Sequence, residues 1–213
     1  MKYKAIIFDF DDTLVESREK KWAHHKAVAK QFYNIDLTDE DIRPHWGKPM
    51  ASLVNSVYKD SDTLENIHKA LVATRNDFRK NIYADTHKIL TTLFDSEVKV
   101  GIISAATRHY IIDDLIRFDL PLENFFVIQG EDDTDKHKPD PDVFLDVFEK
   151  LSKEGIQKKD ILYVGDSIDD FKAASGAGID FVAVTTGLYS SDEFKNTGAE
   201  IIVSNLGELL NFI

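Results

Sequence analysis

The fold of this chain is decided by one short stretch, Ala5-Ile6-Ile7-Phe8-Asp9-Phe10-Asp11-Asp12-Thr13. Its first four residues form a continuous apolar run, which is typical of a strand buried on both faces of a parallel sheet. Alternate side chains of a strand share a face, so we expect Asp9 and Asp11 to point the same way at its carboxyl end. In open α/β sheets this edge is where ligands bind.

The acids of this stretch carry an electrostatic cost. Two carboxylates held ~4 Å apart at an effective dielectric constant near 20 repel each other by about 4 kcal/mol. A fold keeps such a pair where a cation offsets the repulsion, or where the repulsion is part of the chemistry. Asp and Thr are also ordinary turn and helix-capping residues. The choice between these interpretations therefore rests on the rest of the chain.

Further apolar runs recur along the sequence with helical patterns between most of them. The runs lie at 98–103, 125–128, 161–164, 181–184 and 201–203. Alternation of strands and helices predicts an α/β fold with a parallel sheet and right-handed crossovers.

The segment 15–83 breaks this alternation, because it holds helical stripes and no convincing strand. One stripe contains Trp22 and Ala29, and a later one begins near Leu64, where Asp62 and Glu65 resemble a capping box. We therefore expect an all-helical cap domain at 15–83, inserted into a catalytic core formed by 1–14 and 84–213.

Composition narrows the function classes. The 213-residue chain is 43% hydrophobic and has a net charge of −12, which argues against binding nucleic acid or an anionic membrane surface. It contains no cysteine, so disulfides and thiolate metal sites are excluded. No targeting segment or run of transmembrane length is recognisable. We expect a cytoplasmic protein that is a monomer or weak dimer.

Two later segments place polar residues at the same expected sheet edge. Ser104 follows the run 98–103, and a hydroxyl beside the backbone amides of a helix start, such as that of Ala105, binds phosphate well. A plain helix N-cap is the alternative. Asp166 follows the run 161–164, and Asp170 lies four residues later, so both can face one point. Capping of the helix is the alternative interpretation of these acids.

Lys138 supplies a cation in the segment Lys136-His137-Lys138-Pro139-Asp140-Pro141. The two prolines stiffen the chain and suit a lysine that must reach a fixed point. A solvated basic loop is the alternative.

The charges at this edge do not balance. Four aspartates, at positions 9, 11, 166 and 170, converge with one lysine, and a phosphate substrate would add nearly two more negative charges. The site therefore requires a divalent cation, and a set of oxygen ligands with open positions suits Mg²⁺.

The order of these motifs resembles that of the haloacid dehalogenase-like hydrolases. The motifs are Asp9-x-Asp11-x-Thr13, Ser104, Lys138 and Gly165-Asp166-x-x-x-Asp170. The segment 138–141 and the helical insert most resemble the branch of phosphoglycolate phosphatase and β-phosphoglucomutase. The resemblance implies a Rossmann-like core with a helical cap, and a phosphatase that acts on a small phosphorylated metabolite through an aspartyl phosphate.

The resemblance also implies roles for individual residues. Asp9 is the nucleophile, and Asp11 is the general acid and base whose backbone carbonyl also binds Mg²⁺. Thr13, Ser104 and Ala105 hold the loop and the phosphate oxygens, and Lys138 neutralises Asp9 and the transferring group. Asp166 ligates Mg²⁺, and Asp170 ligates it or orients its waters.

The substrate is less defined. Trp46-Gly47-Lys48-Pro49 is a cap loop of the kind that reads the substrate in similar proteins, so Trp46 and Lys48 are candidate substrate contacts. An ordinary helix connector is the alternative. A sugar phosphomutase uses the same aspartates. A phosphoaspartyl receiver also unites clustered acids with a lysine, but its phosphorylated Asp follows a later strand and it has no helical insert.

Overall fold

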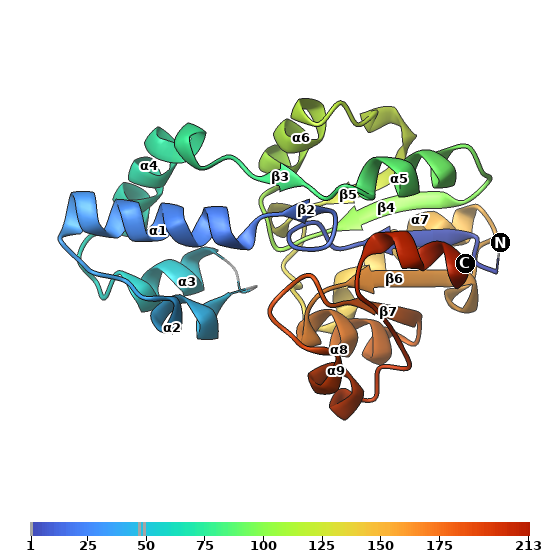
Figure 1. The fold of residues 1–213 in the computed structure, drawn as a ribbon. Coiled ribbons are helices and arrows are strands. Elements are labelled where there is room, and N and C mark those ends of the chain that lie inside the picture. Colours follow the sequence, from blue (N-terminus) through green and yellow to red (C-terminus); the bar gives the residue numbers. More distant parts are fainter. Residues whose placement is uncertain (1, 47, 49) are drawn as a thin grey trace. The chain divides into compact units, whose positions relative to one another are not determined.

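A computed structural model describes residues 2–46, 48 and 50–213 of the chain. The larger of its two compact units contains a six-stranded parallel sheet in the order β5-β4-β1-β6-β7-β8 (Figure 1). The strands are β1 (Ala5–Phe8), β4 (Lys99–Ile103), β5 (Phe125–Gln129), β6 (Ile161–Gly165), β7 (Asp180–Val184) and β8 (Ile201–Val203). The predicted α/β fold with a parallel, Rossmann-like sheet is confirmed.

The first strand has both faces buried, as its continuous apolar run predicts. Ile6 and Phe8 pack into the core cluster that contains residues of α5 (Thr86–Phe94) and α6 (Arg108–Arg117). Ala5 and Ile7 pack into the opposite cluster, with residues of α7 (Leu145–Lys153) and α8 (Ile168–Ala177). Full burial of a large apolar side chain stabilises a fold by roughly 1.5–3 kcal/mol, so this central strand is held firmly from both sides.

The chain divides into two compact units, one formed by Met1–Val15 with Ile82–Ile213 and one formed by Glu16–Asn81. The first, called here the core unit, contains the sheet. It also contains α9 (Ser191–Thr197) and the 3₁₀ helices Leu122–Asn124, Glu131–Asp133, Pro141–Phe144, Lys158–Asp160 and Leu206–Asn211.

The second unit, called here the helical unit, is built from helices. They are α1 (Arg18–Tyr33), α2 (Asp39–Ile42), α3 (Met50–Val57), α4 (Leu64–Thr74) and the 3₁₀ helices Arg43–His45 and Arg75–Phe78. Two short strands, β2 (Val15–Glu16) and β3 (Asn81–Ile82), pair with each other where the chain passes between the units. The sequence did not predict them, because two residues are too few to show a strand's alternation.

Two local details differ from expectation. The N-cap of α4 is Thr63, whose side chain accepts a hydrogen bond from the backbone N–H of Asn66, and Asp62 instead accepts one from the N–H of Thr63. The predicted capping box of Asp62 and Glu65 was therefore placed one residue early. The apolar spacing of Leu206, Leu209, Leu210 and Ile213 is typical of a helix, and this segment forms a 3₁₀ helix, Leu206–Asn211, and not an α-helix.

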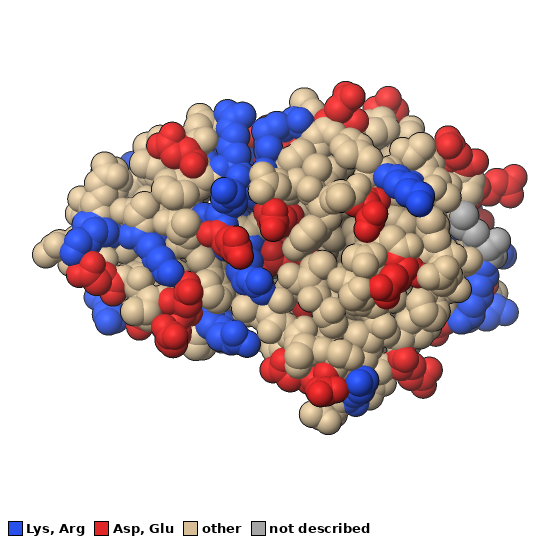
Figure 2. Space-filling view, in the orientation of Figure 1, with Lys and Arg blue, Asp and Glu red and all other residues tan. Residues whose placement is uncertain are grey.

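Charge is distributed unequally between the units. The helical unit carries twelve Lys and Arg against ten Asp and Glu, a net +2, whereas the core unit carries fourteen against twenty-eight, a net −14. In Figure 2 both signs mix over the helical unit, and acidic side chains dominate the visible face of the core. Among the described residues, no helix has the length and apolar character needed to cross a bilayer.

Candidate active site

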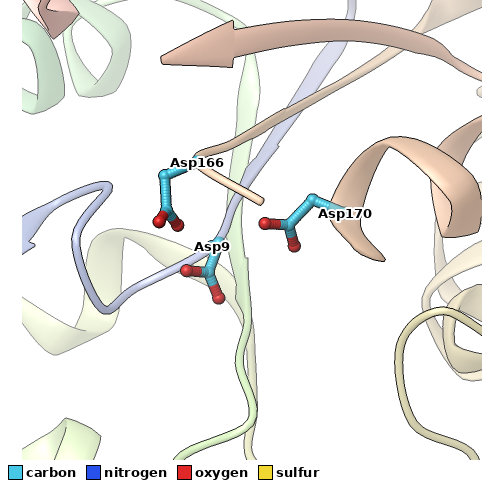
Figure 3. Close-up of side chains that lie close together, drawn as sticks. All are labelled: Asp9, Asp166 and Asp170. Carbon is cyan, nitrogen blue, oxygen red and sulfur yellow. The ribbon is translucent and has the colours of Figure 1, made fainter. Parts of the chain in front are cut away.

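Three buried carboxylates meet at the carboxyl edge of the sheet. Asp9 follows β1, Asp166 follows β6, and Asp170 lies in the first turn of α8. Each offers an oxygen atom within 4.8 Å of the others, and Figure 3 shows the three side chains gathered around a common point. All three are less than one-tenth exposed. Because the carboxyl ends of parallel strands meet at one edge of the sheet, residues that lie far apart in the sequence come together here.

Lys138 is the cation within this cluster. Its ammonium lies 2.7 Å from Asp9 Oδ1 and 2.6 Å from Asp170 Oδ1, and its side chain is only 8% exposed. A buried charge is tolerated where it is paired and hydrogen-bonded. The segment with two prolines thus delivers its lysine to a fixed point between two carboxylates, and the alternative of a solvated basic loop is wrong for Lys138.

The electrostatics show that one lysine does not balance the acids. Burial raises the pKa of Asp9 to about 7, with the charges of Asp170 and Asp11 adding to the effect and Lys138 opposing it. Burial also raises the pKa of Asp166 well above its ordinary value, and the charge of Asp9 adds to this. Burial alone would lower the pKa of Lys138, but the charges of Asp170 and Asp9 outweigh it and hold that pKa well above the usual range. The cluster favours added positive charge.

Asp170 is oriented by its own helix. Ser167 is the N-cap of α8, and it forms a capping box in which Asp170 Oδ2 accepts hydrogen bonds from both the N–H and the hydroxyl of Ser167. Asp170 Oδ1 accepts from Lys138. A Cβ atom at Gly165 would lie 2.6 Å from Asp170 Cγ, so the motif needs glycine there. Capping and site placement are both functions of Asp170.

The loop after β1 is held by hydrogen bonds to its neighbours. The buried hydroxyl of Thr13 donates to Asp166 Oδ1 at 3.2 Å. Asp12 adopts a left-handed φ of 58°, a conformation that Asp and Asn tolerate better than most residues. Its carbonyl accepts a hydrogen bond from Thr186, in the loop after β7. Thr13 is thus directed at a carboxylate of the cluster.

The remaining predicted residues of the core unit lie at the same sheet edge. Ser104 follows β4, is buried, and its hydroxyl oxygen accepts from the N–H of Ala106, while Thr107 is the N-cap of α6. Ser104 is therefore not the helix N-cap that the alternative proposed. Ala105 and Asp11 are half-buried. Among the described residues the side chain of Asp11 lies outside the group of mutually close carboxylates.

Trp46 and Lys48 belong to the helical unit, and the other two residues of their loop, Gly47 and Pro49, lie outside the described residues. The Trp46 ring meets the ring of Trp22 edge-on at 5.9 Å between centroids, and the Lys21 ammonium lies 5.5 Å from the Trp46 centroid. This is an aromatic cluster with a cation at its side.

Sequence reasoning missed two residues of the site. Tyr163 of β6 places its hydroxyl 3.1 Å from Lys138 Nζ, and a Cβ atom at Gly187 would lie 1.8 Å from Asp166 Oδ2. The signal for Gly187 was its place in the loop that follows β7, three residues after the strand ends at Val184. The signal for Tyr163 was a hydroxyl within an otherwise apolar strand.

Comparison with known proteins gives a consistent result. The family model for haloacid dehalogenase-like hydrolases matches residues 6–184. A phosphoglycolate phosphatase of Shigella boydii is 30% identical over 200 residues, which cover 93% of this chain and 72% of that protein. A pyrophosphatase PpaX of Bacillus velezensis is 22% identical, with 97% of this chain and 94% of that protein covered.

A solved structure from Bacteroides fragilis, described as a haloacid dehalogenase-like hydrolase, superimposes with a TM-score of 0.84 at 30% identity. The match covers 97% of this chain and 99% of that chain. Membership of an enzyme family argues against the receiver-type signalling protein considered from the sequence. By its family match, its motif order and its fold, the chain belongs to the haloacid dehalogenase-like hydrolases, with relatives in the phosphoglycolate phosphatase branch.

Proposed function

We propose that this hydrolase is a Mg²⁺-dependent phosphatase that cleaves a small phosphate monoester through an aspartyl-phosphate intermediate. The observation that carries the proposal is the charge imbalance of the buried cluster. Three carboxylates lie within 4.8 Å of one another, and the ammonium of Lys138 pairs with two of them. An arrangement that favours added positive charge suits a metal ion and a phosphoryl group bound together.

The donor set fits Mg²⁺. The cluster consists of carboxylate oxygens, the ligands that this ion prefers. Asp9 and Asp166 would hold the ion with the backbone carbonyl of Asp11. Asp170 already accepts hydrogen bonds at both oxygens, so we assign it to Lys138 and to waters of the ion. Bound Mg²⁺ would neutralise part of the charge of the substrate phosphoryl group.

The residues of the chain would carry out two half-reactions. A carboxylate oxygen of Asp9 attacks phosphorus, the bond from phosphorus to the leaving oxygen breaks, and Asp11 gives that oxygen a proton. Asp11 then takes a proton from the water that attacks the aspartyl phosphate, which releases inorganic phosphate and restores Asp9. Lys138 favours the ionised form of Asp9 and compensates charge on the transferring group. Ser104 and the N–H of Ala105 would bind phosphoryl oxygens, while Thr13 holds Asp166.

The identity of the leaving group is a finer proposal. Two relatives carry the names phosphoglycolate phosphatase and pyrophosphatase, and in both named substrates the leaving group is itself an anion. These two names support an anionic leaving group. A sugar phosphomutase is the second candidate, and stimulation of turnover by a sugar bisphosphate would distinguish it.

The test is steady-state hydrolysis of an aryl phosphate, phosphoglycolate and pyrophosphate, with Mg²⁺ and with a chelator. Acid quenching during turnover should trap phosphate on the wild-type protein and not on Asp9→Asn. Asp192→Asn is the matched control, because the Asp192 side chain is 87% exposed. Full activity in chelator, or trapped phosphate on Asp9→Asn, would contradict the proposal.

A further inference from the structure

Tyr163 is a fully buried polar side chain that the proposed half-reactions do not use. It lies in β6, opposite Ile7 of β1 in the sheet register, and it packs in the core cluster on the face toward α7 and α8. The ring of Phe144 meets its ring edge-on at 5.0 Å. A phenylalanine would fill this position without a polar group, so the hydroxyl requires its own explanation.

The hydroxyl of Tyr163 contacts three separate segments of the chain, those that contain Lys138, Asp170 and Ile103. It lies 3.1 Å from Lys138 Nζ, 3.0 Å from Asp170 Oδ1 and 3.2 Å from the carbonyl oxygen of Ile103 at the end of β4. A phenol has one proton to donate, and its oxygen accepts. It therefore accepts from Lys138 and donates to Asp170 or to the Ile103 carbonyl.

This contact completes the coordination of the lysine. An ammonium has three N–H donors, and those of Lys138 have three partners, Asp9, Asp170 and Tyr163. Two carboxylates alone would engage two of the three donors and leave the third N–H of a buried ammonium without this partner. The Tyr163 hydroxyl accepts from that third N–H, on the side of the ammonium that faces β6.

We propose that Tyr163 is a positioning residue, whose hydroxyl fixes the Lys138 ammonium and the Asp170 carboxylate so that Lys138 faces Asp9. This role rests on the proposed function, in which Asp9 is the nucleophile. Burial raises the pKa of Tyr163 well above its ordinary range, and the charge of Asp170 adds to this, so the group acts as a neutral hydroxyl. Without this hydroxyl we expect the lysine to stay charged, because both carboxylates remain beside it, and to shift its ammonium, because the third N–H loses its partner.

The chain offers a closely matched control for this tyrosine. Tyr3 is also buried, and its hydroxyl likewise accepts from a lysine, Lys2, and donates to an aspartate, Asp180. Asp180 begins β7, so this second trio lies at the amino edge of the sheet, opposite the carboxylates. Tyr3→Phe removes the same hydroxyl from a network of the same residue types whose lysine and aspartate are exposed, away from the site.

The experiment compares kcat and KM for an aryl phosphate in wild type, Tyr163→Phe and Tyr3→Phe, at temperatures where their circular dichroism is the same. We expect kcat of Tyr163→Phe to fall by about tenfold to a hundredfold, the range seen when a hydrogen bond to a charged group is lost. Its KM and its Mg²⁺ affinity should change little, because the Tyr163 hydroxyl bonds to Lys138, Asp170 and the Ile103 carbonyl and not to Asp166, the proposed ligand of the ion, in the described part of the chain. Tyr3→Phe should keep the wild-type kcat. An unchanged kcat in Tyr163→Phe would overturn the proposal.

A second readout does not depend on turnover. The Lys138 ammonium should give a ¹H–¹⁵N resonance, because all its protons are hydrogen-bonded and buried, and Lys138→Met assigns it. The resonance should shift or broaden in Tyr163→Phe and stay in place in Tyr3→Phe; an unmoved resonance in Tyr163→Phe overturns the positioning of Lys138. If the resonance moves but wild type hydrolyses no phosphate ester, the proposed function fails while the contact to Lys138 stands.

Discussion

Gly187 lies so close to Asp166 that a Cβ atom at position 187 would come within 1.8 Å of Asp166 Oδ2. The loop after β7 therefore confines the carboxylate on one side, while the Thr13 hydroxyl holds its other oxygen at 3.2 Å. We expect Gly187→Ala to displace the carboxylate and to weaken Mg²⁺ binding by roughly 10- to 100-fold, as loss of support around a metal ligand does. Isothermal titration with Mg²⁺ measures this directly.

The control for that substitution is Gly176→Ala. A Cβ atom there would approach only the side chain of Pro141, at 3.1 Å, and alanine favours a helix. Its Mg²⁺ affinity should equal that of wild type. Equal affinity in Gly187→Ala would show that Asp166 either moves without cost or does not bind the ion.

Asp9→Asn should abolish turnover without lowering stability in metal-free buffer. Burial raises the pKa of Asp9 to about 7, so the folded state holds this proton more tightly than the unfolded state. Metal-free wild type should therefore lose about 1.4 kcal/mol per pH unit from this group as pH rises from about 4 to about 7. At pH 8 in chelator, Asp9→Asn should melt no lower than wild type. A much lower melting temperature would mean that Lys138 needs Asp9 for folding.

The helical unit should become less stable in acid because of His25. This side chain is 4% exposed, its ring nitrogen lies 3.2 Å from the Tyr58 hydroxyl, and burial lowers its pKa to about 3. The unfolded chain binds the proton first, so stability is complete above about pH 6.5 and falls below it. At pH 5 the loss should be roughly 2 kcal/mol. Melting curves at pH 5 and 7.5 measure it.

His25→Gln should show a smaller difference between the two pH values than wild type. The exposed His87 provides the control, since His87→Gln should keep the wild-type difference. If wild type and His25→Gln respond equally to acid, another group accounts for the loss.

Lys48→Ala and Trp46→Ala should change which phosphate ester is preferred. If their loop reads the leaving group, kcat/KM for the best ester with an anionic leaving group should fall more than kcat/KM for a small aryl phosphate. Lys69→Ala removes another exposed lysine of the helical unit, paired with Glu65, and should leave both values unchanged. Ratios equal to wild type in both loop variants would assign substrate recognition to other residues.

The sequence predicted which residues lie at the carboxyl edge of the sheet, but it did not predict the contacts that Tyr163 and Gly187 make with them. Asp9, Ser104 and Asp166 each follow a strand, and the carboxyl ends of parallel strands meet, so their proximity follows from chain order alone. Tyr163 could not be assigned in the same way. The periodicity of a strand predicts on which face of the sheet a side chain lies, but it does not predict that Lys138, from a distant loop, contacts the hydroxyl. Gly187 was not singled out, because the sequence does not show which atoms a Cβ at that position would approach.

The N-cap of α4 also could not be assigned from the sequence alone. Asp62 and Thr63 are both good N-cap residues, and the choice between them depends on which backbone turn starts α4. Asp170 was open to two interpretations, and both hold, because its two oxygens face different partners.

Residues that contact each other in the site lie far apart in the sequence, so the ribosome synthesises them at different times. Lys138 follows Asp9 by 129 positions, Asp166 follows Thr13 by 153, and Thr186 follows Asp12 by 174. Contacts across such long loops form late, because closing the loop costs entropy before the contact stabilises it. Asp9 is therefore exposed on the nascent chain well before Lys138, which pairs with it, has been synthesised. A chain truncated before the loop after β7 lacks Thr186, which holds the loop after β1. We expect such a chain to have no phosphatase activity.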